Sequence, residues 1–394
     1  MTNPWAPPPQ QPAGAPPSYA PPVNAYPPPA GPYAPAPGPY GPPLSQLRLP
    51  EVPTEPRWWP RPHAEPQPYL HLLRTRHHRW WKSLLGLLLV AVLWLGFQLV
   101  AGLVVLVHLL ATGGSMGDFE RLLEQVTPGT LLFTNLTLAA AIPVTGVAVM
   151  VCHQERMGWL SSVLGRVRWR MLFAFTGLGA ALMAVSVGVA VLLPSAAGGG
   201  LPALDPPPLG TLVGVTLVVL LTTPLQAAGE EYLFRGYLAQ AIASWIPLRL
   251  AALLVTTPIT AALFALAHGT QDPWLFADRF GFGVAASILV WLTGGLEAAI
   301  GLHTVNNVVA FGFATATGTL ADSLSSTEAP AGSVLLDLAV LAVFTAGVWV
   351  WTSRRPVRTR TDGPAPRPDG PAPLPAGPAP LPAPRGEEGV FWSP

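Results

Sequence analysis

Long runs of apolar residues, separated by short polar segments, fill the middle of the chain. Most of them approach the roughly 20 residues that a helix needs to cross a hydrocarbon core of about 30 Å. The alternating pattern of a closed barrel is missing, so helices are left as the way to satisfy backbone groups in lipid. The pattern predicts an all-α, polytopic membrane helix bundle of about eight transmembrane helices, over roughly 84–111, 131–152, 171–194, 211–228, 250–268, 280–293, 295–314 and 333–352.

Two proline-rich tails flank the apolar middle. Of 49 prolines in 394 residues, 25 lie in residues 1–70 and 12 in residues 354–394. Such segments lack apolar periodicity and cannot form a packed core. We therefore expect a disordered tail over 1–68, a transmembrane domain over 69–353 and a second disordered tail over 354–394. The tails either dock in aromatic-lined grooves of partner proteins or act as solvated tethers.

The distribution of basic residues predicts how the bundle is oriented. Cytoplasmic loops of membrane proteins carry an excess of Lys and Arg. With both termini in the cytoplasm, 13 basic residues lie inside, against Arg121 and Arg279 outside. The inside set is Arg74, Arg76, Arg79, Lys82, Arg156, Arg166, Arg168, Arg170, Arg249, Arg354, Arg355, Arg358 and Arg360. We expect a multi-pass protein of the plasma membrane with both termini cytoplasmic.

Overall composition narrows the partners and the source. The formal net charge is +1 and only 10% of residues are charged, which argues against a nucleic-acid partner. The lone Cys152 excludes an internal disulfide and a thiolate zinc cluster. One lysine against 20 arginines, in a chain rich in Ala, Gly and Pro, suggests a GC-rich bacterial genome.

Ionisable residues at the end of the fourth apolar run are the first candidates for chemistry. Charged groups inside membrane segments are costly and indicate function by default. Glu231 and Arg235 are four residues apart, so they can pair on one helix face. Glu230 lies about 100° away and is left without that partner, which suits a general base. The structural alternative is an ion-pair network that holds helices together.

Histidines follow in the later runs. His268 ends the fifth run, and on its own it is more often an interfacial residue. His303 and Asn307 are four residues apart in the seventh run, so both side chains project from one face. For that pair the structural alternative is a hydrogen bond between helices.

Signatures of other membrane chemistries are missing from the sequence. There is no H-E-x-x-H helix of a zinc protease and no Walker loop of an ATP-driven pump. The G-x-S-x-G elbow of a serine hydrolase is also missing.

Three motifs together resemble the CPBP intramembrane protease family, which covers type II CAAX proteases and bacteriocin-processing or immunity proteins. They are Glu230-Glu231-x-x-x-Arg235, Phe264-x-x-x-His268 and His303-x-x-x-Asn307, in the family's order. The resemblance covers about residues 211–312. It implies an endopeptidase that hydrolyses peptide bonds of membrane-anchored peptide or protein substrates within the lipid bilayer.

The resemblance also implies roles for these residues. Glu230 and His268 would activate a water, His303 and Asn307 would bind the developing oxyanion, and Glu231 with Arg235 would form the supporting pair. Two mechanisms stay open because they require the same residues. One uses a catalytic Zn²⁺ held by Glu230, His268 and His303, and the other uses no metal. Because bacteria are not expected to carry C-a-a-X prenyl proteins, the prenylated substrate is not carried over.

Two other functions stay open at this stage. Buried carboxylates and a histidine among eight spans also suit an ion-coupled transporter, although the inverted repeats expected of one are not visible. A non-catalytic membrane scaffold or immunity protein, whose proline-rich tails recruit partners, is the other alternative.

Overall fold

The structure, a computed structural model, describes residues 63, 65–75, 77–192 and 203–362. Within these ranges the regular elements are all helices, and two isolated β-bridges are the only strand-like pairings. The all-α class is therefore confirmed. Most of the two predicted tails, 1–68 and 354–394, lies outside the described residues.

Helices of the described part follow one another with short connections. In chain order they are the 3-10 helix η2 (Tyr69–His71), α1 (Trp80–Ala111), α2 (Met116–Glu124), α3 (Pro128–Ala139), α4 (Ala141–Ala148), the π-helix η3 (Val149–His153), α5 (Gly158–Ser161), α6 (Trp169–Leu192), α7 (Leu209–Glu231), the π-helix η4 (Tyr232–Leu238), α8 (Ala239–Ala243), α9 (Arg249–Leu266), α10 (Pro273–Thr293), α11 (Glu297–Ala316), α12 (Leu320–Ser325) and α13 (Ala331–Arg354).

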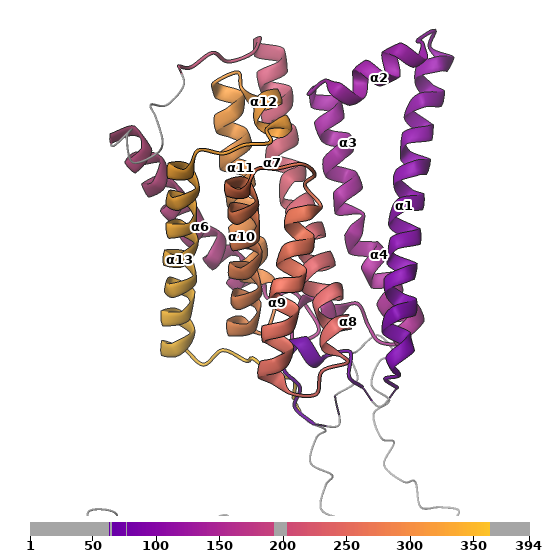
Figure 1. Ribbon diagram of the computed structural model, residues 1–394, viewed down its shortest axis with the longest axis vertical. Helices are drawn as coiled ribbons and strands as arrows, with labels where there is room; N and C mark the ends of the chain where they lie inside the picture. The colour runs from indigo at the N-terminus through magenta and orange to yellow at the C-terminus, as the bar shows by residue number, and fades with distance from the viewer. Residues whose placement is uncertain (1–62, 64, 76, 193–202, 363–394) are drawn as a thin grey trace, which may run out of the picture. The chain divides into compact units, whose positions relative to one another are not determined.

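These helices pass up and down through the bundle (Figure 1). Seven segments of the described part are long and apolar enough to cross a membrane: α1, α3 to η3, Trp169–Val189 of α6, α7 to α8, α9, α10 and α13. The remaining predicted span forms α11, a helix of 20 residues that packs against α6 and α7. Its polar side chains keep it outside that set, so the described residues hold seven candidate spans where the hydrophobic pattern predicts about eight.

Two predicted spans are longer in the structure. The fourth, predicted over 211–228, continues from Leu209 to Ala243 because its charged residues face other helices instead of lipid. The sixth, predicted over 280–293, begins at Pro273, where Asp272 caps the helix by accepting from the Leu275 backbone N–H. In both cases a polar stretch that the hydrophobic pattern reads as a loop is helix inside the protein.

The lower end of the bundle in Figure 1 is covered by the segment before α1. Tyr69, Leu72 and Leu73 are buried there, and the Tyr69 hydroxyl donates to the carbonyl of Leu160. The His71 ring lies 2.9 Å from the carbonyl of Ile246, at the end of the turn after α8. This segment therefore packs under the helices as part of the main core.

Candidate active site

One cavity of about 810 Å³ contains the polar residues of the three motifs. Glu230 of α7, His268 after α9, and His303 and Asn307 of α11 all line its wall. Phe264, four residues before His268, lines it as well. Residues far apart in the sequence thus meet at one wall, which no pattern within a single helix could establish.

Glu231 and Arg235 lie behind that wall. Arg235 Nη1 donates to Glu231 Oε1 over 3.0 Å, and both side chains are almost fully buried. This is the i, i+4 pair that the spacing predicts. The Arg235 guanidinium also lies 4.4 Å from the centre of the Phe264 ring, a cation–π contact that adds to the ion pair.

His303 lies between the two glutamates. Its Nδ1 is 2.9 Å from Glu231 Oε1, and its Nε2 is 3.6 Å from Glu230 Oε2. Since a carboxylate can only accept, Nδ1 carries the hydrogen of the first contact. Glu231 therefore receives both Arg235 and His303 on one oxygen and fixes the orientation of the imidazole ring.

Gln226 is a site residue that the sequence reading missed. Its Nε2 donates to Glu230 Oε1 over 2.5 Å, and its Oε1 accepts from Asn307 Nδ2 over 3.1 Å. Gln226 is four residues before Glu230, so the spacing that pairs Glu231 with Arg235 was also the available signal here. The bridge leaves Glu230 Oε2 with no hydrogen-bond partner among the described residues.

His268 lies just beyond the end of α9 at Leu266, in a turn instead of the predicted span. Its Nδ1 donates to the carbonyl of Phe264 over 2.7 Å, which leaves Nε2 for the cavity. Partial desolvation of the imidazole ring disfavours its charged form and lowers the pKa of His268 below 6.5. The attraction of the Glu230 carboxylate raises this pKa and offsets only part of the effect. The neutral ring is the form that can accept a proton near pH 7.

The backbone around Glu230 is unusual in two respects. Gly229 lets α7 approach α3 closely, because a Cβ at this position would lie 2.3 Å from the carbonyl oxygen of Leu138. Directly after Glu231 the chain turns into the π-helix η4, a feature frequently found at functional sites. Both features set the position of the two glutamates relative to the neighbouring helices.

The cavity carries further charged residues that the motifs do not include. Asp278 and Arg279 of α10 and Asp337 of α13 line it, and Arg279 Nη1 donates to Gln271 Oε1 over 2.9 Å. Only their polarity inside apolar runs could have indicated them.

The zinc set that the resemblance leaves open beside a metal-free mechanism, Glu230, His268 and His303, is not among the ligand groups of the described residues. Among the described residues, no three His, Cys, Asp or Glu side chains come close enough together to hold one metal ion. Glu230 and His303 face each other, but His303 Nδ1 is engaged by Glu231 and His268 does not complete a set with them. We therefore derive no step through a metal.

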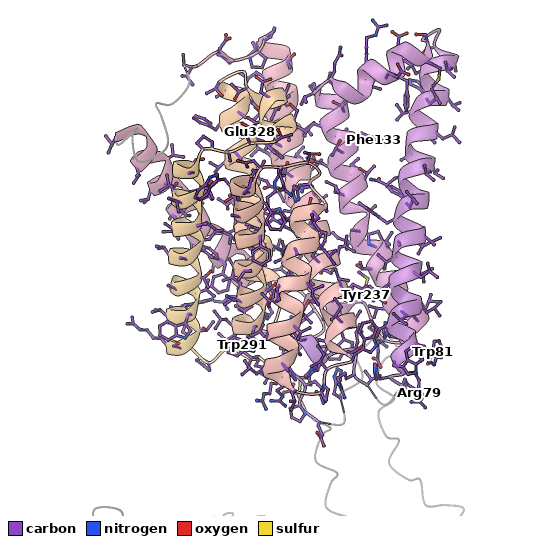
Figure 2. All side chains as sticks on the ribbon, in the orientation of Figure 1. Arg79, Trp81, Phe133, Tyr237, Trp291 and Glu328 are labelled. Carbon is purple, nitrogen blue, oxygen red and sulfur yellow. The ribbon has the colours of Figure 1, made fainter. Side chains whose placement is uncertain are left out.

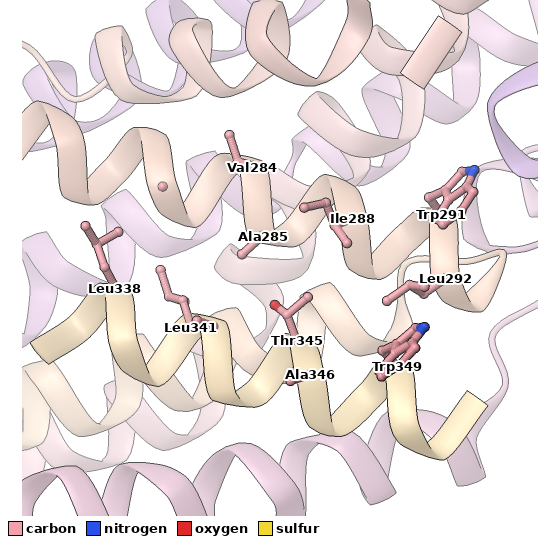
Figure 3. A pocket seen from close by; sticks show the side chains of 12 residues that line it. Val284, Ala285, Ile288, Trp291, Leu292, Leu338, Leu341, Thr345, Ala346 and Trp349 are labelled. Atoms are coloured by element: carbon pink, nitrogen blue, oxygen red, sulfur yellow. The ribbon is translucent and has the colours of Figure 1, made fainter. Parts of the chain in front are cut away.

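A second hollow of about 590 Å³ lies between α10 and α13 (Figure 3). Trp291 and Trp349 lie at one end of it, and no titratable residue is part of its lining. It offers no group for acid–base chemistry, so the cavity around Glu230 is the candidate active site.

A membrane-spanning helix bundle that encloses a carboxylate, two imidazoles and an amide in one cavity has the make-up of an intramembrane hydrolase. Residues 212–309 match the family model described as Type II CAAX prenyl endopeptidase Rce1-like. The match includes Glu230, Glu231, His268, His303 and Asn307, and it confirms the resemblance of this region to the CPBP proteases. The searches of curated proteins and of solved structures each returned no match.

Proposed function

We propose that this protein is an intramembrane endopeptidase that hydrolyses peptide bonds of membrane-anchored substrates. The observation that supports it most is that Glu230, whose Oε2 has no hydrogen-bond partner among the described residues, lines one cavity with His268, His303 and Asn307. A buried carboxylate oxygen without a hydrogen-bond partner is costly, so its retention favours a functional role over a structural one.

In this proposal Glu230 and His268 activate the attacking water. Glu230 Oε1 is held by Gln226, which leaves Oε2 without a hydrogen-bond partner among the described residues. His268 Nε2 is free, because Nδ1 is engaged by the Phe264 carbonyl. Water donates one proton to Glu230 as its oxygen attacks the scissile carbonyl, and this proton passes to the leaving amine as the C–N bond breaks. Neutral His268 accepts the second proton of the water from the carboxylic acid product. A positioned general base of this kind contributes about 10²–10⁴-fold to the rate.

His303 and Asn307 supply the hydrogen bonds to the developing oxyanion. Glu231 orients the His303 ring so that Nε2 points towards Glu230, and in our mechanism Nε2 carries a proton during the attack. Asn307 Nδ2, which donates to Gln226 in the resting site, turns to the oxyanion. Removing one such donor typically costs about 10²–10³-fold in kcat.

The proposed reaction uses no metal, since the described residues offer no three-ligand set. A chelator should therefore leave the cleavage rate unchanged, and the purified protein should contain less than one metal ion per chain. Loss of activity on chelation, with recovery on adding Zn²⁺, would contradict this part of the proposal.

The central test is cleavage of membrane-anchored peptides by purified protein in liposomes. We expect Glu230→Gln and His268→Ala to lower the rate at least about 100-fold. Ser186→Ala, at the same cavity but away from the reacting groups, is the matched control and should keep full activity. Unchanged cleavage in both site variants, with their unfolding temperatures preserved, would overturn the assignment.

A further inference from the structure

The candidate active site has an opening at only one end of the bundle in the described part of the chain. Exposed residues at the upper end in Figure 1 line the cavity: Gln125 before α3, Ser323 and Leu324 of α12, and, partly exposed, Ser333 near the start of α13. His303 lies six residues from the start of α11 and Phe313, which also lines the cavity, lies ten residues further. At 1.5 Å per residue the cavity thus extends about 15 Å along α11 towards this opening.

The opposite end is closed by packed side chains. Trp159, Leu160, Tyr232 and Leu296 are buried below the site, and the Tyr232 hydroxyl lies 2.6 Å from Ser161 Oγ. Arg168 and Glu297 pair there over 2.6 Å, at the lower start of α11.

The segment before α1 covers the same closed end. Tyr69, Leu72 and Leu73 add a further buried layer under the helices. None of these closing residues lines the cavity. Water and substrate can therefore reach Glu230 from the upper end and not through the lower end.

Charged and aromatic residues indicate which compartment each end faces. Arg79 and Trp81 lie at the lower end, whereas Glu328 lies near the upper end (Figure 2). The loops and helix ends at the lower end of Figure 1, before α1, between η3 and α6, at the start of α9 and after α13, carry most of the described basic residues. These are Arg74, Arg79, Lys82, Arg156, Arg166, Arg168, Arg170, Arg249, Arg354, Arg355, Arg358 and Arg360. Among the described residues the upper loops and helix ends have two basic residues, Arg121 and Arg279, and carry Asp118, Asp205, Asp272, Asp322 and Glu328.

Most exposed tryptophans of the described part lie on the lower side, whereas Trp274 stands at the upper start of α10. Trp80, Trp81, Trp245, Trp291 and Trp349 are all more than one third exposed. Trp and Tyr concentrate at membrane–water interfaces, and the excess of basic residues places the lower end in the cytoplasm.

From these observations we propose that the active-site cavity opens on the non-cytoplasmic side of the membrane. The substrates are then membrane-anchored peptides or proteins that present an extended segment on that side. This inference rests on the proposed function for its substrates, while the side of the opening stands on the fold and the charge distribution alone. It deepens the assignment because it excludes substrates whose cleavage site stays in the cytoplasm.

Thiol labelling of the full chain in intact cells tests the side of the opening. Cys152 is the single cysteine and is buried, so Cys152→Ser gives a background without thiols. Ser323→Cys places a thiol at the opening and Ser353→Cys places one at the lower end of α13, and both native serines are exposed. A membrane-impermeant maleimide should label the Ser323→Cys variant in intact cells and the Ser353→Cys variant only after permeabilisation. The reverse pattern, or equal labelling of both, would overturn the proposal.

A second experiment connects this side to catalysis. Ser333→Cys lines the cavity, so a bulky impermeant maleimide added to intact cells should lower cleavage of a membrane-anchored reporter at least about 10-fold, while the Ser353→Cys variant keeps its rate. Equal rates in the labelled and unlabelled Ser333→Cys variant would overturn access through this opening. If no variant cleaves any reporter but the labelling follows the expected pattern, the proposed function fails and the side of the opening stands.

Discussion

Removing the charge of Glu231 is the sharpest test of how the site is supported. Glu231 Oε1 accepts from both Arg235 and His303, at 3.0 and 2.9 Å. Glu231→Gln keeps the size of the side chain but leaves the Arg235 guanidinium, 1% exposed, without its carboxylate. The pair is fully enclosed by protein, so neither water nor salt can screen the remaining charge.

Breaking a buried pair by removing one partner typically costs about 3–5 kcal/mol. For a domain of this size each kcal/mol shifts the unfolding temperature by about 2–4 °C, which predicts a decrease of about 6–20 °C. The double variant Glu231→Gln/Arg235→Met should recover most of this loss, because no unpaired charge remains and a buried ion pair contributes little relative to apolar packing.

The assay is thermal unfolding of purified protein in detergent micelles, followed by tryptophan fluorescence. Asp362→Asn is the matched control, since Asp362 pairs with Arg358 at the same i, i+4 spacing but at the surface. Exposed pairs contribute little, so this control should leave the unfolding temperature nearly unchanged. If Glu231→Gln melts within 2 °C of the parent protein, or if the double variant melts no higher than the single one, the reasoning about a buried support is refuted.

Three further predictions concern catalysis and helix packing. Asn307→Ala should lower kcat about 10²–10³-fold while KM changes little, because a donor to the oxyanion acts in the transition state. The assay is cleavage of a membrane-anchored fluorogenic peptide, and a change confined to KM would contradict the role of Asn307. The cleavage rate should decrease as the pH falls below 6.5, because the pKa of His268 lies below 6.5 and only the neutral ring accepts a proton. A rate that rises as the pH is lowered from 7 to 5 would exclude His268 as a base. Gly229→Ala should destabilise the protein by about 1–3 kcal/mol, because the new Cβ would meet the Leu138 carbonyl oxygen at 2.3 Å. Gly210→Ala, in the same helix with open space around it, is its control, and equal unfolding temperatures of the two variants would contradict the close approach of α7 and α3.

The hydrophobic pattern by itself determined the class of the fold and most of its helices. Apolar runs long enough to cross a membrane leave a helix as the one local structure that satisfies the backbone, so the pattern needed no tertiary information. It was less reliable at the ends, as the extension of α7 to Ala243 in α8 and of α10 to Pro273 shows. There the polar residues face other helices or the cavity, and hydropathy cannot distinguish such positions from loops.

The sequence also determined the pair within one helix, because Glu231 and Arg235 depend only on the spacing of an α-helical face. The convergence of Glu230, His268, His303 and Asn307 was decided by tertiary structure, since it joins three segments through the packing of α11 on α7 and of α9 on η4 and α10. The same holds for the Gln226 bridge between Glu230 and Asn307, and for the closed lower end of the cavity. A linear pattern specifies which face of a helix is polar, but only the packed bundle decides what that face meets.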